Sequence, residues 1–422
     1  MTRLRTALAA AAVASVLVPA WATPARADHD APCSIGEVPG SERLADTHEK
    51  DNPAFDRMHV ERAQEVATGE GVKVAVIDSG IVGGPGAVVP YGGVAIPGVD
   101  PSTRLSGHGT IVANLIAGPH GVARDAQVYD VKVFDVEGAD TTQGERPLTS
   151  AGMAAGIEAV IEAHARERFD VVNISLAAPS SDPQLEAAIA RLVALDLVVV
   201  ASSGNREEGD AASEDGFKGT PNSDAEVFPA DYPGVVAVSA TPADGSDPGQ
   251  YVKPNLDTDV AAPTAGAISV NATGQVCVVP EVATSWAAAE VSGILALLRE
   301  QFPRETPRQL VARLQATTEG GGVPVVSEGA SEDEGEDAVA MVDPWTGAGV
   351  VQAHDALTRE IRPGRQGKIE TTVRETRADA QAPPAPQRVD LFSTPRAILL
   401  WSGLVAGSLL ALAFMLRPLL RR

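Results

Sequence analysis

Five short apolar runs constrain the fold of this chain more than any other feature of its sequence. They have five to seven residues each, the length of a buried strand, and span 72–77, 128–134, 171–176, 197–201 and 235–239. Helical stretches lie between them, at 108–117, 150–166 and 183–195, the last with Asp182 and Pro183 as cap and first-turn residues. Strands alternating with helices of this length predict βαβ units, and therefore an α/β fold around a mainly parallel sheet.

The composition indicates one large domain with appendages and excludes a nucleic-acid-binding protein. Of the 422 residues 44% are hydrophobic, which is enough for a sizeable core. The formal net charge is −23, and no basic face of the kind that binds nucleic acid stands out. Acidic residues gather at 206–224 and 327–337, which we expect to be solvated loops. A calcium site is the alternative there, but no EF-hand spacing supports it.

The first 27 residues have the features of an export signal. Arg3 and Arg5 give a positive start, residues 7–18 are apolar, and 25–27 (Ala-Arg-Ala) fit a cleavage site. An ordinary amphipathic helix is the alternative. Cleavage there would leave residues 28–62, a polar stretch without long periodicity, as an N-terminal extension.

A second apolar stretch, 397–416, lies near the C-terminus and contains no charged residue. Its twenty residues would form a helix of about 30 Å, the thickness of a bilayer core. The alternative is a buried helix of a soluble domain, which the Pro-rich linker at 362–396 disfavours. The tail at 417–422 carries three arginines, so the positive-inside rule predicts a single-pass membrane protein with a cytoplasmic C-terminus and an extracytoplasmic main domain.

The chain contains only two cysteines, Cys33 and Cys277. An even count in an exported protein indicates one disulfide, which would tie the N-terminal extension to the main domain. Two separate thiols are the alternative, because bridging requires that the two Cα atoms lie close together.

Four residues offer chemistry that fits together. Ser285 opens an Ala-rich helical run, where free N–H groups can support an oxyanion, but a serine needs a base to become a good nucleophile. His108 is the one histidine that is flanked by glycines and leads directly into an apolar helix. Asp78 ends the first apolar run, where α/β sheets place their sites, and Asn205 follows the fourth and could donate to an oxyanion. Taken singly, each also fits an ordinary turn or helix start.

The order Asp78, His108, Asn205, Ser285 is that of subtilisin. The surrounding residues resemble the motifs of subtilisin-like (S8) serine peptidases: Val74-Ala75-Val76-Ile77-Asp78-Ser79-Gly80, Gly107-His108-Gly109-Thr110, 198–205, and Thr284-Ser285 with Val291-Ser292-Gly293. Segments 59–72, 228–235 and 347–351, and the layout of the whole chain, are similar to those of mycosins, the membrane-anchored members found in type VII secretion systems.

This resemblance implies a subtilisin-like three-layer fold over 63–361 that cleaves protein or peptide substrates without a metal or cofactor. The residues that it assigns are Ser285 as nucleophile, His108 as base, Asp78 as the partner of His108, Asn205 in the oxyanion hole, and Ser175, Leu176 and Ala177 along the substrate. It also implies exported proteins as substrates and a type VII secretion membrane complex as partner. The alternative is a mainly structural subunit of that complex.

Several positions depart from the pattern of the family. Ala283 replaces the usual glycine before the nucleophile pair, which requires a negative φ angle. Ala289 replaces a proline, a change that suits a helix interior. Ala177-Ala178 replaces a pair of glycines, so we expect two methyl groups to crowd the substrate trough. These departures bear on the efficiency of cleavage and motivate the structural alternative.

Overall fold

The computed structural model describes residues 33, 52–136, 141, 144–206, 225–319, 343–369 and 393–417. The chain divides into two units, Met1–Glu370 and Thr371–Arg422. The predicted export signal lies outside the described residues, as do 327–337, nearly all of 206–224, most of the linker, and the last two arginines of the tail.

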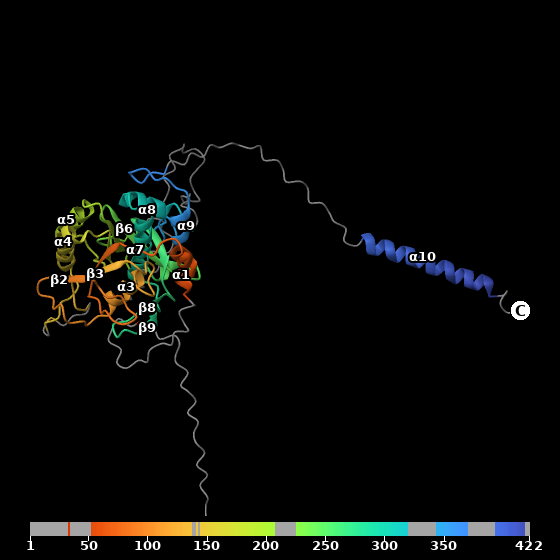
Figure 1. Cartoon of the computed structure of the whole chain (residues 1–422), viewed down its shortest axis with the longest axis horizontal. Coiled ribbons are helices and arrows are strands. Elements are labelled where there is room, and N and C mark those ends of the chain that lie inside the picture. The colour runs from red at the N-terminus through yellow and green to blue at the C-terminus, as the bar shows by residue number, and fades with distance from the viewer. Residues whose placement is uncertain are drawn as a thin grey trace, which may run out of the picture. The chain divides into compact units, whose positions relative to one another are not determined.

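A seven-stranded sheet is the centre of the first unit (Figure 1). Its strands are β1 (Lys73–Asp78), β2 (Gly92–Ala95), β3 (Gln127–Lys132), β4 (Val171–Ile174), β5 (Val198–Ser202), β6 (Val235–Thr241) and β7 (Thr258–Pro263). Their order is β2-β3-β1-β4-β5-β6-β7, and every neighbouring pair is parallel. The structure confirms the five predicted strands. The edge strands β2 and β7 were not predicted, because neither is an uninterrupted apolar run.

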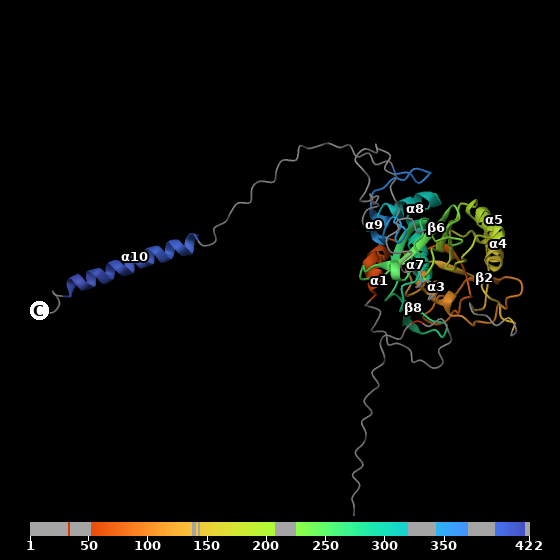
Figure 2. The ribbon, with the colours of Figure 1, turned by 180° about the vertical axis from the view of Figure 1, so that it is seen from behind.

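Helices cover both faces of this sheet (Figure 2). On one face lie α3 (His108–Ile116) and α7 (Thr284–Gln301), and on the other lie α4 (Ser150–Glu167) and α5 (Pro183–Val193). Strand β1 shows the division, since Val74 and Val76 belong to the core beneath α3 and α7 whereas Ala75 and Ile77 belong to the core beneath α4 and α5. The predicted three-layer α/β arrangement is therefore confirmed.

Two surface helices begin with side-chain caps that the sequence specifies. The carboxylate of Asp182 accepts hydrogen bonds from the first two free N–H groups of α5, at 2.9 and 3.0 Å, and Pro183 occupies the first turn as predicted. Helix α8 (Pro307–Gln315) begins with a capping box between Thr306 and Gln309.

The described end of the N-terminal extension belongs to the main core. Helices α1 (Pro53–Met58) and α2 (Val60–Gln64) bury Met58 and Val60 completely, and α2 packs against α9 (Ala353–Thr358). These helices have only six and five residues, too short for a helical period to be recognised in the sequence.

The structure confirms a disulfide between Cys33 and Cys277. Cys277 lies on β9 (Val276–Val278), which pairs with β8 (Ile268–Val270) in a small antiparallel hairpin, and the N–H of Cys33 donates to the carbonyl oxygen of Val278 at 2.8 Å. Ser269 on β8 donates to the carbonyl oxygen of Ile111 in α3 at 2.9 Å. The hairpin therefore connects the N-terminal extension to the helix that starts at His108.

Loss of this disulfide is expected to lower the free energy of unfolding. The bond closes a loop between positions 244 residues apart, so Cys33→Ser or Cys277→Ser should cost about 2–5 kcal/mol. Urea unfolding measures the change. The double variant serves as control and should lose no more than either single variant. Single variants as stable as the native chain would contradict the structural role.

The second unit contains one helix, α10 (Ser393–Leu416), among its described residues. Its segment Pro395–Leu416 has 22 residues and a mean hydropathy of 2.1. This helix is long and apolar enough to cross a bilayer, and it includes the predicted span 397–416.

Candidate active site

Asp78 and His108 are joined by hydrogen bonds. Asp78 is the last residue of β1 and is fully buried, and its two carboxylate oxygens lie 2.9 and 3.0 Å from Nδ1 of His108. The N–H of Ser79 donates to the same carboxylate at 2.7 Å. Because an ionised carboxylate only accepts, the neutral ring carries its hydrogen on Nδ1 and presents Nε2 as the acceptor.

The residue after His108 must be a glycine, because there is no room for a side chain at this position. A Cβ atom on Gly109 would lie 3.0 Å from Oδ1 of Asp78 and 2.8 Å from the carbonyl oxygen of Gly80. The N–H of Gly109 also donates to the hydroxyl of Ser79 at 3.0 Å. A larger residue here would push the imidazole away from its carboxylate partner.

Trp286 belongs to the site, although sequence reasoning did not single it out. Its ring lies beside that of His108, with centroids 4.8 Å apart, and its Nε1 donates to Oε1 of Glu281 at 3.2 Å. Since Trp286 directly follows Ser285 on α7, this contact holds the start of α7 against the imidazole. Aromatic residues are common in buried helices, so nothing in the sequence distinguishes this one.

Ser285 is the second residue of α7 and lines a cavity of about 400 Å³. Ala283, the cap residue before the helix, has φ −144° and ψ 140°. This extended backbone accommodates alanine without strain, so Ala283 has the negative φ angle that a residue with a side chain requires here. Ala289 is fully buried in the helix interior, where alanine is favourable.

Asn205 lines the same cavity as Ser285. Its side-chain oxygen accepts from the N–H and the hydroxyl of Thr284, at 2.7 and 3.0 Å. Because Oδ1 of Asn205 accepts both bonds, the Nδ2 group is the end of the amide that can donate. The preceding Gly204 has φ +105°, and a Cβ atom on it would lie 2.9 Å from Val227, so the turn that places Asn205 requires glycine.

The predicted trough residues Ser175, Leu176 and Ala177 also line this cavity. Ala177 is exposed, whereas Ala178 is only 7% exposed and exchanges two backbone hydrogen bonds with Phe228, at 2.7 and 2.9 Å. The side chain of Ala178 belongs to the core beneath α4 and α5. Both alanines line the cavity, the exposed Ala177 and the largely buried Ala178, so the expected crowding of the trough stays a prediction.

A buried chain of hydrogen bonds supports the backbone of Ser285 from below. The hydroxyl of Ser292 donates to Asn173 at 3.0 Å, the amide of Asn173 donates to Ser175 at 2.9 Å, and the hydroxyl of Ser175 donates to the carbonyl oxygen of Ser285 at 2.8 Å. This chain fixes the start of α7 to β4. The sequence did not reveal this role of Asn173 and Ser292, because the link exists only after the two elements pack.

Side chains that line the cavity without having been predicted include Leu148, Glu226 and Lys253. Among the described residues no group of three or more His, Cys, Asp or Glu side chains is placed to hold a metal ion. A hydroxyl and an amide donor line the cavity, and an imidazole held by a buried carboxylate lies against Trp286, the residue after that hydroxyl. Such a set can perform acyl transfer.

The sequence matches the family model of the subtilases, Peptidase S8, over residues 69–339. Mycosin-1 of Mycobacterium tuberculosis is 32% identical over 345 residues, which cover 73% of each chain.

Solved structures agree with this assignment. MycP1 from Mycobacterium smegmatis superimposes with a TM-score of 0.58 and 26% identity, covering 79% of this chain and 89% of that one. The MycP3 protease from a type VII (ESX-3) secretion system gives 0.57 and 27%, covering 79% and 93%. The chain belongs to the subtilase family and is a subtilisin-like serine endopeptidase, with the mycosins among its relatives.

Proposed function

We propose that this endopeptidase hydrolyses peptide bonds with Ser285 as nucleophile, His108 as general base and Asp78 as the partner that orients His108. The observation that carries the proposal is the double hydrogen bond between Asp78 and Nδ1 of His108. It fixes the orientation of the ring so that Nε2 can act as the base, beside Trp286, the residue after Ser285.

In this mechanism the Ser285 oxygen attacks the carbonyl carbon of the scissile bond while Nε2 of His108 takes its proton. Asp78 stabilises the imidazolium that forms. The imidazolium then protonates the leaving amine, the C–N bond breaks, and an acyl group remains on Ser285. Water attacks this ester with His108 again as base, which releases the acid and restores the hydroxyl.

We assign the oxyanion hole to Nδ2 of Asn205, together with N–H groups at the start of α7. Removing this donor by Asn205→Ala is expected to lower kcat about 10²–10³-fold with little change in KM. Steady-state kinetics on a protein substrate measures this.

Thr284→Val provides a graded control for the oxyanion assignment. It removes one of the two bonds that orient Asn205 while the backbone N–H remains, so its loss of kcat should be smaller. A kcat unaffected by Asn205→Ala would exclude this residue from the oxyanion hole.

The substrate trough and the cellular setting complete the proposal. Ser175, Leu176 and Ala177 are placed along the bound peptide because they line the cavity that holds Ser285. Helix α10 anchors the protein in the cell membrane, with the peptidase domain extracytoplasmic and the C-terminus cytoplasmic. Similarity to mycosin-1 and to a protease of a type VII secretion system supports exported proteins as substrates and a type VII secretion membrane complex as partner.

A secretion assay separates catalysis from assembly. The Ser285→Ala chain should still support export by the complex if its structural contribution suffices, but the exported substrates should remain uncleaved. A strain that lacks the whole chain is the control. Normal processing of exported proteins by the Ser285→Ala strain would contradict the proposed function. The paired Asp78 and His108 do not favour the alternative of a purely structural subunit.

A further inference from the structure

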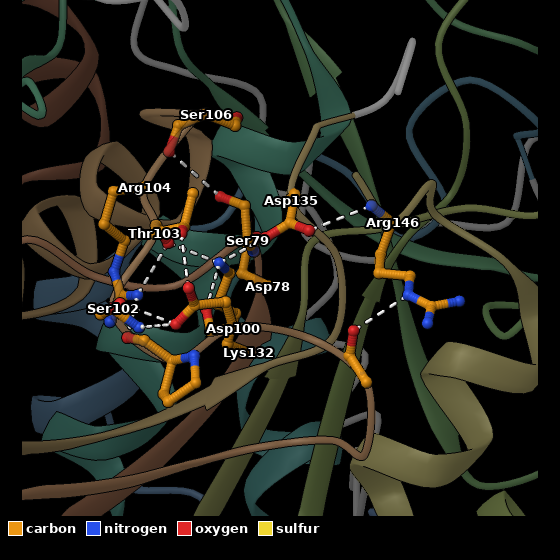
Figure 3. A network of polar contacts seen from close by, with 12 residues as sticks. Asp78, Ser79, Asp100, Ser102, Thr103, Arg104, Ser106, Lys132, Asp135 and Arg146 are labelled. Atoms are coloured by element: carbon orange, nitrogen blue, oxygen red, sulfur yellow. Dashed lines mark hydrogen bonds and ion pairs between the residues drawn. The ribbon is translucent and has the colours of Figure 1, made fainter. Parts of the chain in front are cut away.

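A buried ammonium group lies on the strand next to the one that ends at Asp78 (Figure 3). Lys132 ends β3 and is the register partner of Asp78 on the neighbouring strand. It is only 1% exposed, although a lysine is rarely buried without a compensating partner. Its Nζ donates to the carboxylate of Asp135 at 2.6 Å and to the carbonyl oxygens of Asp100 and Thr103.

The two carbonyl groups belong to a tightly folded segment, 100–104. The carboxylate of Asp100 accepts from the N–H and hydroxyl of Ser102 and from the hydroxyl of Thr103, at 2.7 to 2.9 Å, and the bonds from Ser102 and Thr103 lower the pKa of Asp100 to about 2. The guanidinium of Arg104 donates to the carbonyl oxygen of Thr103 and forms a 3.2 Å ion pair with Asp130 on β3. Two cations therefore stabilise this segment and connect it to β3, namely Lys132 at the end of β3 and Arg104, which pairs with Asp130.

This segment leads within four residues to His108. The N–H of His108 donates to the hydroxyl of Ser106 at 3.2 Å, and the carbonyl oxygen of Ser106 accepts from Ser79 at 3.5 Å. The position of the imidazole thus depends on two supports. One is Asp78 on β1, and the other is the chain that arrives from the segment held by Lys132.

Asp135 extends the network toward the substrate. Its second carboxylate oxygen accepts the N–H of Arg146 at 3.0 Å, and the side chain of Arg146 donates to the carbonyl oxygen of Gly98 at 2.9 Å. Leu148, two residues after Arg146, lines the cavity with Ser285. The buried ion pair of Lys132 and Asp135 therefore joins the segment before His108 to Arg146 (Figure 3). Through Arg146 it reaches Leu148 in the wall of the substrate cavity.

We infer that Lys132 is a positioning residue for His108, acting with Asp135 through the segment 100–106. The inference rests on the proposed function of His108. Lys132 touches neither substrate nor reacting atoms. It holds the segment 100–106, which leads into α3. Nε2 of His108 is thereby held where it can take the proton of Ser285.

The test compares Lys132→Met with Arg313→Met in the full chain. Arg313 is a matched control because it is also a buried cation, 3% exposed, that pairs with a carboxylate and donates to carbonyl oxygens, namely those of Arg359 and Ile361. Its contacts lie away from the catalytic cavity. Both variants should lose similar stability, so any difference in catalysis reports positioning.

Two readouts decide between positioning and mere stability. Lys132→Met should slow fluorophosphonate labelling of Ser285 and lower kcat on the order of 10²-fold while KM is kept. It should also speed amide hydrogen exchange at 102–107, whereas Arg313→Met should do neither. A folded Lys132→Met chain that is labelled at the native rate would overturn the inference. So would an Arg313→Met chain whose labelling rate and kcat fall as far as those of Lys132→Met.

Asp135→Asn covers the case in which Lys132→Met does not fold. It keeps the shape of the side chain but removes the charge and one of the two acceptors, so it should slow labelling and also raise KM through the wall at Leu148. Native labelling and exchange in this variant would overturn the inference. If the native chain itself is not labelled, the proposed function fails, and exchange at 102–107 alone then decides whether Lys132 holds the segment.

Discussion

Ser285→Ala is expected to lower kcat for peptide hydrolysis by about 10⁶-fold, the size of the loss known for the nucleophile of subtilisin, a member of the same family. Without the hydroxyl no acyl-enzyme can form, and only stabilisation of water attack by Asn205 and the helix N–H groups remains. Kinetics on a fluorescent protein substrate measures the loss. Ser246→Ala, at an exposed loop position, is the control and should retain native activity.

The losses of kcat caused by substitutions at Asp78, His108 and Ser285 should not add. His108→Ala alone should cost nearly as much as Ser285→Ala, and the double variant should be no slower, because base and nucleophile act in one step. Asp78→Ala should cost less, about 10⁴-fold, since it removes the orientation of His108 but not the base itself. Additive losses would contradict a shared role of Asp78, His108 and Ser285.

The second large effect concerns stability and depends on pH. Glu290 lies on α7 five positions after Ser285, is completely buried, and neither of its carboxyl oxygens has a hydrogen-bond partner among the described residues. Burial raises the pKa of Glu290 well above its usual range. The folded chain therefore holds this proton over a pH range in which the unfolded chain has released it.

The direction in which stability changes with pH follows from proton linkage. Below the unfolded pKa of about 4.3 both states are protonated, so the ionisation of Glu290 imposes no penalty. As the pH rises above that value, stability falls by about 1.4 kcal/mol per pH unit until the folded pKa is reached. Glu290→Met removes the titrating group and the unpaired oxygens, so it should be more stable than the native chain at neutral pH.

Urea unfolding at several pH values between 4 and 8 measures the advantage of Glu290→Met, which should grow with pH. Glu290→Gln is the matched control. It removes the titration but keeps a buried polar group, so it should lose the pH dependence and gain less stability at each pH. An advantage independent of pH, or a Glu290→Met chain less stable than native at pH 8, would contradict this account.

Local patterns in the sequence were sufficient for the layers of the fold. The apolar runs identified β1, β3, β4, β5 and β6, because a buried parallel strand needs no polar face. Asp182 and Pro183 marked the start of α5 through the chemistry of the cap. The two edge strands escaped detection because one begins with Gly92-Gly93 and the other mixes polar residues with Pro263.

The candidate site was predictable where it depends on residue type and order, and not where it depends on packing. Asp78, His108, Asn205 and Ser285 stand in recognisable motifs. The contact of Trp286 with His108 and the burial of Lys132 arise only when segments distant in the sequence meet. The backbone pairing of Ala178 with Phe228 likewise forms only when a later segment packs beside this one.

The assignment of Ser285 is tested most directly by reaction with a fluorophosphonate, which traps an activated serine. After labelling of the native chain and proteolysis, mass spectrometry should locate the phosphonyl group on Ser285 alone. The label should be absent from the Ser285→Ala and His108→Ala chains, and it should form more slowly as the pH falls and His108 becomes protonated. A folded native chain that takes up no label, or takes it up at another serine, would contradict the account.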